Sequence, residues 1–397
     1  MTIPLLVVAV DELNRHVDAL GPAQLLGRPM SELVDAQRQA AGARLVSLEL
    51  PGWFAALLAQ AGVLLYFWRS GGAARWRDAL RARMRSEAAV RFAFGATLAL
   101  LARVAAIVPA FYVWRVERVM GLSQALTRIW GYEYAIGTIL GMLVAGVIVA
   151  LVLWLVERTH QWYLYTIAGI VVVAVVGALV NPYVVAPLFE RYTPLGGPLA
   201  ARASAFAAQH GHAGIPILVE HRVDRIPESA ATTQGVGPTA RIVLEETIVG
   251  AATTGEIEYY VAHELAELDA HDPLNLALVD AAIAVFGVAL AVVVADRIRF
   301  RRDDDPISRT TLVGAFLALV YIPGVLVDHE VVVSMQLRAT RAAVAMTGDR
   351  VSALRAFVRA GDERVEQVCP SAAGRVFLYR VPSLGQDATA IGSPSGC

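Results

Sequence analysis

Six apolar stretches, each long enough to cross a membrane, constrain the fold of this chain more than any other feature. They cover residues 50–68, 91–114, 133–156, 162–181, 278–296 and 311–328. A helix needs about 20 mostly apolar residues to cross the hydrocarbon core of a bilayer. Over its 397 residues the chain is 56% hydrophobic and only 17% charged, which is too apolar for an ordinary soluble protein. The sequence therefore predicts a mainly α, polytopic α-helical membrane protein.

Aromatic residues mark several ends of these stretches, as interfacial residues do in membrane proteins. They are Trp53, Trp68, Trp114, Trp154, Trp162 and Tyr163. The first ten residues are also apolar, but they are too few to cross a membrane. They lack a basic leading region and precede Asp11 and Glu12, so we do not expect a cleaved signal peptide.

Arginines gather in the first and fifth connections between the apolar stretches. The first connection carries Arg69, Arg75, Arg77, Arg81, Arg83 and Arg85, and the fifth carries Arg297, Arg299, Arg301, Arg302 and Arg309. Basic connections face the cytoplasm in most membrane proteins. The other polar parts, at 1–49, 182–277 and 329–397, are then expected together on the opposite side of a bacterial cytoplasmic membrane.

These boundaries divide the chain into five parts. We expect an N-terminal segment at 1–49, four membrane spans within 50–181, and two further spans within 278–328. Residues 182–277 and 329–397 would form one polar domain, because two spans between them return the chain to the same side.

Residues 256–273, read as EIEYYVAHELAELDAHDP, carry most of a zinc-protease motif. In H-E-x-x-H, two histidines one helical turn apart bind zinc while the glutamate acts as general base. His263 and Glu264 match the first two motif positions, but Glu267 stands where the second histidine belongs. The motif is therefore one ligand short.

The helix that carries this motif can be read in two ways. Thr253 and Glu256 have the spacing of a capping box, and Asp272 precedes a proline that predicts the end of the helix. The polar side chains that follow share one face, which is typical of a solvated amphipathic helix. Alternatively, this face is a metal site.

A metal site on this face would use two residues four positions apart. His263 with Glu267, or Glu267 with His271, would project side by side and share one ion. All three could not, since eight residues advance a helix by about 12 Å.

Several segments together resemble type I CAAX prenyl proteases, which are integral-membrane zinc metalloendopeptidases. They are NPYVVAPLFERYTPL at 181–195, GVGPTARIVLEETIV at 235–249, VAHELAELDAHDP at 261–273 and MTGD at 346–349. Their order and spacing agree with that family over about residues 160–390. The resemblance implies a zincin-like metallopeptidase domain with a small β element near residues 217–244.

The resemblance also implies roles for single residues. His263 matches the family's first zinc ligand and Glu264 its general base. Glu267 replaces the second ligand, and Gln336 falls where the family has a ligand glutamate. Thr340 replaces a carboxylate that orients a ligand histidine. A neutral amide is a much poorer zinc ligand than a carboxylate.

Three further positions depart from the family on a looser alignment. Ala230 stands where the family's edge strand carries an asparagine, while Val381 and Asp387 stand where a histidine and an arginine stabilise the oxyanion. We therefore expect an impaired enzyme, a pseudoprotease that binds or regulates a peptide or membrane-protein partner. An exposed strand edge at 240–244 would hold the partner by β-augmentation.

Two other functions are consistent with the sequence. The first is an active metalloendopeptidase with zinc on His263, Glu267 and one of His329 or Glu330. The second is a transporter or channel, suggested by Arg103 and Asp280 inside predicted spans, although pairing within the bundle would equally explain these two residues.

Other features have simpler interpretations. The formal net charge of -1 argues against a nucleic-acid partner. His210 and His212 are typical of a helix end and its turn. Cys369 and Cys397 can form at most one disulfide, which fits only an extracytoplasmic tail.

Overall fold

A computed structural model describes residues 17, 19–221, 230–298 and 305–397. Within these residues, six helices are long and apolar enough to cross a membrane, and each contains one predicted stretch. They are α4 (Ala36–Arg69), α6 (Glu87–Val119), α7 (Thr127–Arg158), α8 (Trp162–Val184), α12 (Asp272–Arg297) and α13 (Pro306–Thr347). The prediction of a mainly helical, six-span membrane fold is confirmed.

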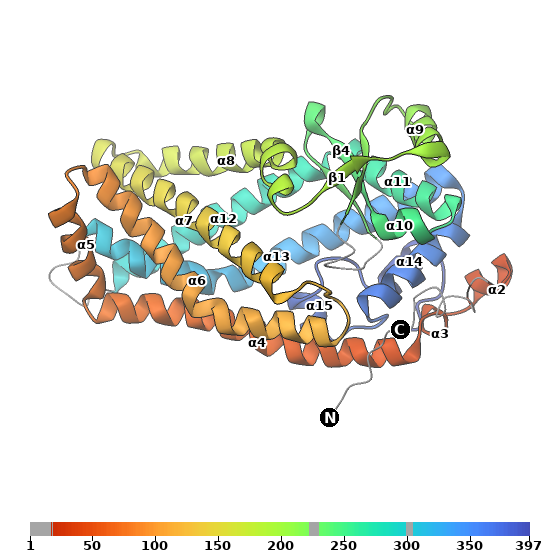
Figure 1. Cartoon of the computed structure of the whole chain (residues 1–397), viewed down its shortest axis with the longest axis horizontal. Helices are drawn as coiled ribbons and strands as arrows, with labels where there is room; N and C mark the ends of the chain where they lie inside the picture. Colours follow the sequence, from red (N-terminus) through yellow and green to blue (C-terminus); the bar gives the residue numbers. More distant parts are fainter. Residues whose placement is uncertain (1–16, 18, 222–229, 299–304) are drawn as a thin grey trace.

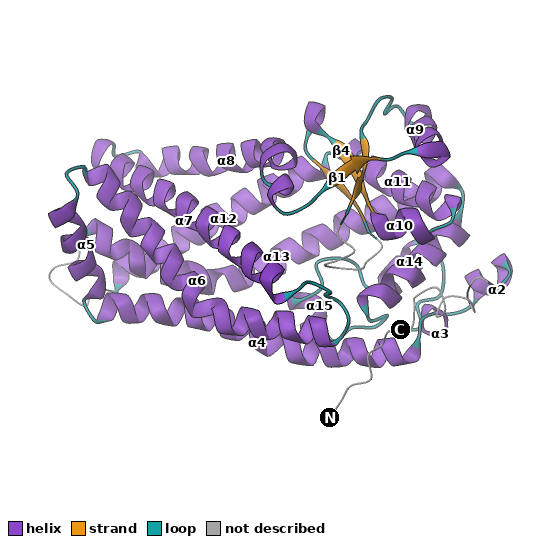
Figure 2. Cartoon of the chain, in the orientation of Figure 1, coloured by secondary structure: helices purple, strands orange, loops and turns teal. Residues whose placement is uncertain are grey.

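Shorter elements gather at one end of this helical bundle (Figures 1 and 2). The helices are α2 (Pro22–Gly27), α3 (Met30–Leu33), α9 (Gly197–Gln209), α10 (Glu246–Ala251), α11 (Thr254–Asp269), α14 (Arg350–Arg364), α15 (Ala372–Phe377) and α16 (Leu384–Ala390). The strands are β1 (Tyr192–Pro194), β2 (Ile217–Glu220), β3 (Ala231–Gln234) and β4 (Arg241–Glu245). One further short helix, α5 (Gly72–Arg83), lies at the opposite end.

The bundle is built by neighbouring helices that pack in pairs. α6 contacts α4 and α7, while α12 contacts α8 and α13. The arginine-rich connection that includes α5 lies at the end of the molecule remote from the sheet (Figure 1). The domain formed by the shorter elements, called the polar domain below, includes the 182–277 insertion and the tail at one end.

Two long helices, α4 and α13, extend furthest beyond the boundaries expected from the sequence. α4 begins at Ala36, because Asp35 caps its first turn by accepting a hydrogen bond from the backbone N–H of Arg38. α13 continues without a break past residue 328 and ends at Gly348, which takes the left-handed conformation with φ 67°. One helix therefore joins the membrane bundle directly to the polar domain.

The β element is a four-stranded sheet in the order β1-β2-β4-β3. β2 and β4 are parallel, whereas β1 and β3 pair with their neighbours in antiparallel fashion. The prediction that residues 240–244 form an exposed strand edge is wrong, since β4 lies between β2 and β3. Every residue of β4 is buried, as expected of a central strand with a nearly continuous apolar run. The edge strands are β1 and β3.

The polar domain has two apolar cores, one on each side of α11. Towards the sheet, Ile257, Val261 and Leu265 pack against buried side chains of β2, β4 and α9. On the other side, Tyr259 and Ala262 pack against α14. Because both faces are covered, α11 is a central helix of the polar domain.

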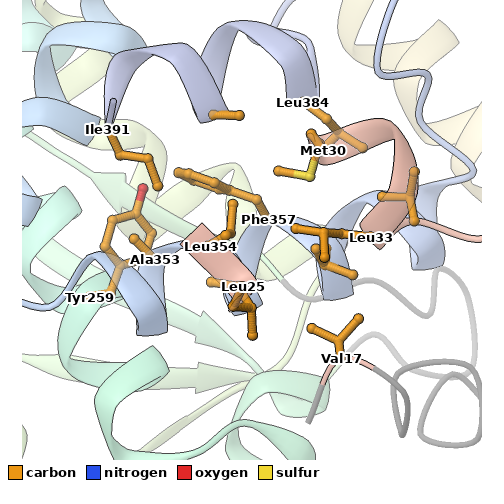
Figure 3. Close-up of a cluster of buried hydrophobic side chains, with 14 of the residues drawn as sticks. Val17, Leu25, Met30, Leu33, Tyr259, Ala353, Leu354, Phe357, Leu384 and Ile391 are labelled. Atoms are coloured by element: carbon orange, nitrogen blue, oxygen red, sulfur yellow. The ribbon is translucent and has the colours of Figure 1, made fainter. Parts of the chain in front are cut away.

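The second of these cores joins the two ends of the described chain (Figure 3). Its buried side chains include Leu25, Met30 and Leu33 near the N-terminus with Leu384 and Ile391 near the C-terminus. The backbone N–H of Met30 also donates to the carbonyl of Pro394 at 2.9 Å. The N-terminal segment is therefore an integral part of the polar domain.

The ionisable residues inside the bundle have partners. The guanidinium of Arg103 lies 4.1 Å from the ring centroid of Tyr134 and 3.4 Å from the hydroxyl of Thr138. Asp280 lies within electrostatic range of Asp328 and Arg380. These surroundings agree with the alternative that both residues are paired within the bundle.

Two smaller sequence predictions are also confirmed. His210 caps the C-terminus of α9, and Cys369 is joined to Cys397 by a disulfide. The apolar first ten residues lie outside the described residues.

Candidate active site

The motif helix α11 begins as the sequence predicts. The hydroxyl of Thr253 accepts from the N–H of Glu256, and Oε2 of Glu256 accepts from the N–H of Thr253 at 2.7 Å. These reciprocal bonds satisfy two of the orphan donors at the start of the helix. The helix ends at Asp269, before the predicted proline.

The polar face of α11 is buried, so the interpretation of a solvated face is wrong. His263 and Glu267 are each 9% exposed and Glu264 is 3% exposed. The reason is that α13 and β3 lie against this face. Buried ionisable side chains require partners, and their partners define the candidate site.

Gln336 of α13 connects the two motif residues that face it. Its Oε1 lies 2.9 Å from Nε2 of His263, and its amide nitrogen donates to Oε1 of Glu267. The distance between Nε2 of His263 and Oε1 of Glu267 is 3.7 Å, which suits an ion pair better than a hydrogen bond. One amide thus bridges the first-ligand and second-ligand positions.

Glu264 lies beside this triad and contacts the sheet. The hydroxyl of Thr233 on β3 lies 2.8 Å from Oε2 of Glu264 and donates to it. The same hydroxyl lies 3.2 Å from the carbonyl oxygen of Glu264. The edge strand therefore fixes the side chain that matches the family's general base.

The electrostatics of the site follow from burial and close charges. Burial lowers the pKa of His263, but the carboxylate of Glu267 outweighs burial and raises the pKa to about 9. Burial raises the pKa of Glu264 to about 8, and repulsion from Glu267 acts in the same direction. At neutral pH His263 is therefore a cation and Glu264 is largely protonated.

Asp387 of α16 extends this polar cluster through its contact with Thr340 of α13. The hydroxyl of Thr340 lies 3.4 Å from Oδ1 of Asp387, and Tyr259 also hydrogen-bonds to Thr340. Burial raises the pKa of Asp387 to about 8, with repulsion from Glu366 as the next cause. Asp387 thus stands close to the candidate site, where the looser alignment places the family's oxyanion-stabilising arginine.

The residues at this site do not fit a catalytic zinc ion. Known catalytic sites supply three nitrogen, sulfur or carboxylate ligands, whereas here the third position is the neutral amide of Gln336. In the part of the chain that the structure describes, no group of three His, Cys, Asp or Glu side chains is placed to hold a metal. Nδ1 of His263 is buried without a hydrogen-bond partner among these residues, although a ligand histidine normally donates this N–H to an acceptor.

The other candidate ligands have different surroundings. Nδ1 of His329 lies 3.0 Å from the carbonyl oxygen of Val376, and Glu330 is exposed. His271 follows the end of α11 in the left-handed conformation at φ 57°, so α11 does not place its side chain one helical turn from Glu267. That His329 or Glu330 completes a zinc site stays a prediction.

Two residues of the site were not identified from the sequence. Thr233 and Tyr259 have no motif of their own, and their contacts depend on how β3 and α13 pack against α11. Ala230, predicted at the edge strand, directly precedes β3, and its carbonyl accepts from the N–H of Glu245.

Known proteins match the chain in both sequence and fold. A family described as CAAX prenyl protease N-terminal, five membrane helices, matches residues 52–191. The CAAX prenyl protease 1 of Saccharomyces cerevisiae is 26% identical over 165 residues, which are 41% of this chain and 36% of that protein. The match thus spans about a third of the yeast protein's length.

The fold match extends over almost the whole chain. The crystal structure of S. mikatae Ste24p has a TM-score of 0.75 and 18% sequence identity, and covers 96% of this chain and 94% of that chain. The chain is thus a multi-pass integral membrane protein with the Ste24p fold. Part of its sequence is thus similar to the CAAX prenyl proteases, and its fold is that of Ste24p.

Proposed function

We propose that this chain is a pseudoprotease, a membrane homologue of the CAAX prenyl proteases that binds a peptide or membrane-protein partner without cleaving it. The observation that carries the proposal is the bridge made by Gln336 between His263 and Glu267. Its amide engages the same imidazole nitrogen and carboxylate oxygen that a metal would need. A zinc ion and this hydrogen-bonded triad are therefore competing occupants of one position.

The charges of the triad support the same proposal. An imidazolium at His263 has no lone pair to give to a metal, since both of its ring nitrogens carry protons. The pKa of about 9 means that zinc would have to displace this proton at neutral pH. The ion pair with Glu267 stabilises the protonated form.

The edge strand β3 is the surface that we assign to the partner. In the described residues β3 pairs with β4 on one side and with no further strand on the other. An unpaired strand edge binds an extended peptide through main-chain hydrogen bonds. Thr233 of this strand contacts Glu264, so a peptide added here would pass beside the candidate site.

The test is the zinc content of the detergent-purified protein after dialysis. We expect fewer than about 0.1 zinc ions per chain, with the same value in a His263→Ala variant. About one zinc per chain that is lost in His263→Ala would overturn the proposal. Partner binding is tested with a photo-reactive residue at Thr232 of β3, an exposed position, and at Arg83 as a remote control. We expect an intact cross-linked partner from position 232 only.

The retained Glu264 favours a second candidate, an active metalloendopeptidase with a rearranged site. The pKa of this buried carboxyl group, about 8, is close to neutral pH, as is typical of general acids and bases. This function requires Gln336 to leave the triad so that Glu267 is free to bind zinc. Hydrolysis of membrane-proximal peptides that disappears in Glu264→Gln, together with stoichiometric zinc, would establish it.

We further propose that the polar domain faces away from the cytoplasm. The arginine-rich connection that includes α5 lies at the end of the bundle remote from the sheet, and the Cys369–Cys397 disulfide suits an oxidising compartment. For a bacterial cytoplasmic membrane this side is the periplasm or cell exterior. A C-terminal alkaline phosphatase fusion should be active and a C-terminal green fluorescent protein fusion dark; the reverse result would contradict this orientation.

A further inference from the structure

A cavity of about 490 Å³ lies in the C-terminal part of the polar domain. It is lined by Leu337, Arg341, Val368, Cys369, Pro370, Arg375, Ser383, Gly385, Gln386, Thr389, Ala390, Ser395 and Cys397. This volume is in the range of small-molecule sites. None of the three motif residues His263, Glu264 and Glu267 lines it, so the cavity is separate from the candidate active site.

The lining of the cavity carries positive charge without compensation. It contains two arginines, Arg341 of α13 and Arg375 of α15, and no aspartate or glutamate among the described residues. Both arginines are exposed, and neither has an ion-pair partner in the part of the chain that the structure describes. Two guanidinium groups at one cavity repel each other, and a bound anion would offset this repulsion.

Several neighbouring arginines bind acceptors within the protein. Ion pairs join Arg338 to Asp272, Arg359 to Glu256, Arg364 to Glu366 and Arg380 to Asp328, and Arg350 donates to the carbonyl of Gly392. Among the described residues, Arg341 and Arg375 have no such ion pair and remain available for an anion.

The remaining walls combine apolar side chains with small polar ones, and they are held in place. The disulfide Cys369–Cys397 forms one wall, and the N–H of Gly385 donates to the carbonyl of Val368 at 3.2 Å. A Cβ atom on Gly385 would lie 2.8 Å from both the sulfur of Cys397 and the carbonyl oxygen of Val368. Only glycine permits this close approach of α16 to the disulfide. The cavity therefore does not depend on a ligand to form.

We propose that this cavity is a binding site for a small organic anion, a carboxylate or phosphate monoester with a compact apolar body. Arg341 and Arg375 bind the oxyanion, since guanidinium groups donate paired hydrogen bonds to carboxylates and phosphates. Leu337, Pro370 and Ala390 contact the apolar body. The chemistry of the lining selects against neutral molecules of the same shape.

The test is isothermal titration of the purified full-length protein with phenyl phosphate in about 0.15 M salt, where general surface attraction is screened. We expect saturable binding of phenyl phosphate. Benzyl alcohol and inorganic phosphate should each bind at least about tenfold more weakly, because benzyl alcohol lacks the anion and inorganic phosphate lacks the apolar body. Equal binding of inorganic phosphate would overturn the assignment to an organic anion.

Charge variants locate the site. Arg341→Gln and Arg375→Gln should each weaken phenyl phosphate binding about tenfold, whereas Arg83→Gln, an exposed arginine at the opposite end of the molecule, should leave it unchanged. Because both cavity arginines are exposed, these variants should keep the thermal midpoint of the parent. An unchanged affinity in both folded variants would overturn the proposal.

A cavity-filling variant separates binding inside the cavity from attraction to its rim. Ala390→Phe keeps both arginines but occupies the space that the apolar body needs. We expect phenyl phosphate binding to be lost. If a folded Ala390→Phe protein binds phenyl phosphate as the parent does, the cavity is not the site. If the phenylalanine variant does not fold, Ala390→Leu adds a smaller side chain to the same space and should weaken the binding of phenyl phosphate.

Discussion

The guanidinium of Arg359 on α14 lies 3.3 Å from the carboxylate of Glu256 on α11, and both side chains are buried. The other oxygen of this carboxylate caps the start of α11. One side chain thus begins the helix of the candidate site and joins it to the C-terminal core.

We expect Glu256→Ala to destabilise the protein by about 3–5 kcal/mol, because the change removes the buried carboxylate that pairs with Arg359 and caps α11. The thermal midpoint of the detergent-purified protein measures this effect. Glu258→Ala is the matched control, since Glu258 on the same helix makes only a surface ion pair with Arg202 at 3.4 Å. Glu258→Ala should lower the free energy of unfolding by less than about 1 kcal/mol. Equal losses in the two variants would contradict a structural role for the buried pair.

Replacement of the bridging amide should create a metal site. Gln336→Glu would give His263 and Glu267 a second carboxylate partner, which is the kind of ligand set that catalytic zinc accepts. We expect zinc content to rise from near zero to about one ion per chain, measured by elemental analysis after dialysis. Gln336→Leu, with a similar volume and no ligand atom, is the control. If Gln336→Glu gains no zinc, the amide is not what excludes the metal.

The stability of the polar domain should fall as the pH rises through the pKa of Asp387. This pKa is about 8 in the folded protein against 3.8 for an unperturbed aspartate, so the folded state binds the proton more tightly. The stabilisation is complete below pH 3.8 and is lost as the pH rises through about 8. Asp387→Asn should match the parent below about pH 4 and become increasingly more stable than the parent as the pH rises to about 8, because it never buries a charge. Thermal midpoints across this range test the prediction, and a parallel pH profile for both proteins would refute it.

The disulfide should contribute strongly to stability. It joins residues 28 positions apart, and closure of a loop of this size removes about 3–4 kcal/mol of entropy from the unfolded chain. We expect Cys397→Ser to lower the thermal midpoint, and a reducing agent to lower the parent to the same value. The reducing agent should leave Cys397→Ser unchanged. If the oxidised and reduced parent proteins have the same thermal midpoint, the bond is absent or does not contribute to stability.

The tail helix α15 should be attached to the bundle by aromatic contacts. The ring of Phe377 lies 5.7 Å from that of Trp53 and 5.3 Å from that of Phe54, both on α4. We expect Phe377→Ala to accelerate amide hydrogen exchange in residues 372–380, because a well-packed aromatic pair contributes about 0.5–1.5 kcal/mol beyond its buried area. Phe377→Tyr retains the ring and is the control. Unchanged exchange in Phe377→Ala would mean that other contacts hold α15.

The membrane architecture was predictable from the sequence, because span length and hydropathy are local properties. The six apolar stretches and the Thr253 capping box required only their own residues to be recognised. Exact boundaries were not predictable. The apolar pattern of α13 gives way to polar residues near 328, yet the helix continues because α11 and α16 pack against its second half.

The candidate site was predicted less completely, because its character depends on tertiary packing. The sequence identified His263, Glu264, Glu267 and Gln336 as single positions. It did not reveal that Gln336 bridges two of them. The exposed strand edge was placed at 240–244 on the resemblance of residues 235–249 to the family's edge strand. A resemblance of this kind is accurate to within one strand only, and β3, not β4, lies at the edge.

The shared core of the two chain ends has a consequence for biogenesis. Leu25, Met30 and Leu33 are synthesised before the six candidate membrane spans are complete, but their packing partners Leu384 and Ile391 follow the last of these spans. This core of the polar domain therefore cannot close until all six spans have been synthesised. Until then, three large apolar side chains of the leading segment stay uncovered beside the membrane, as a substrate for chaperones and quality-control proteases.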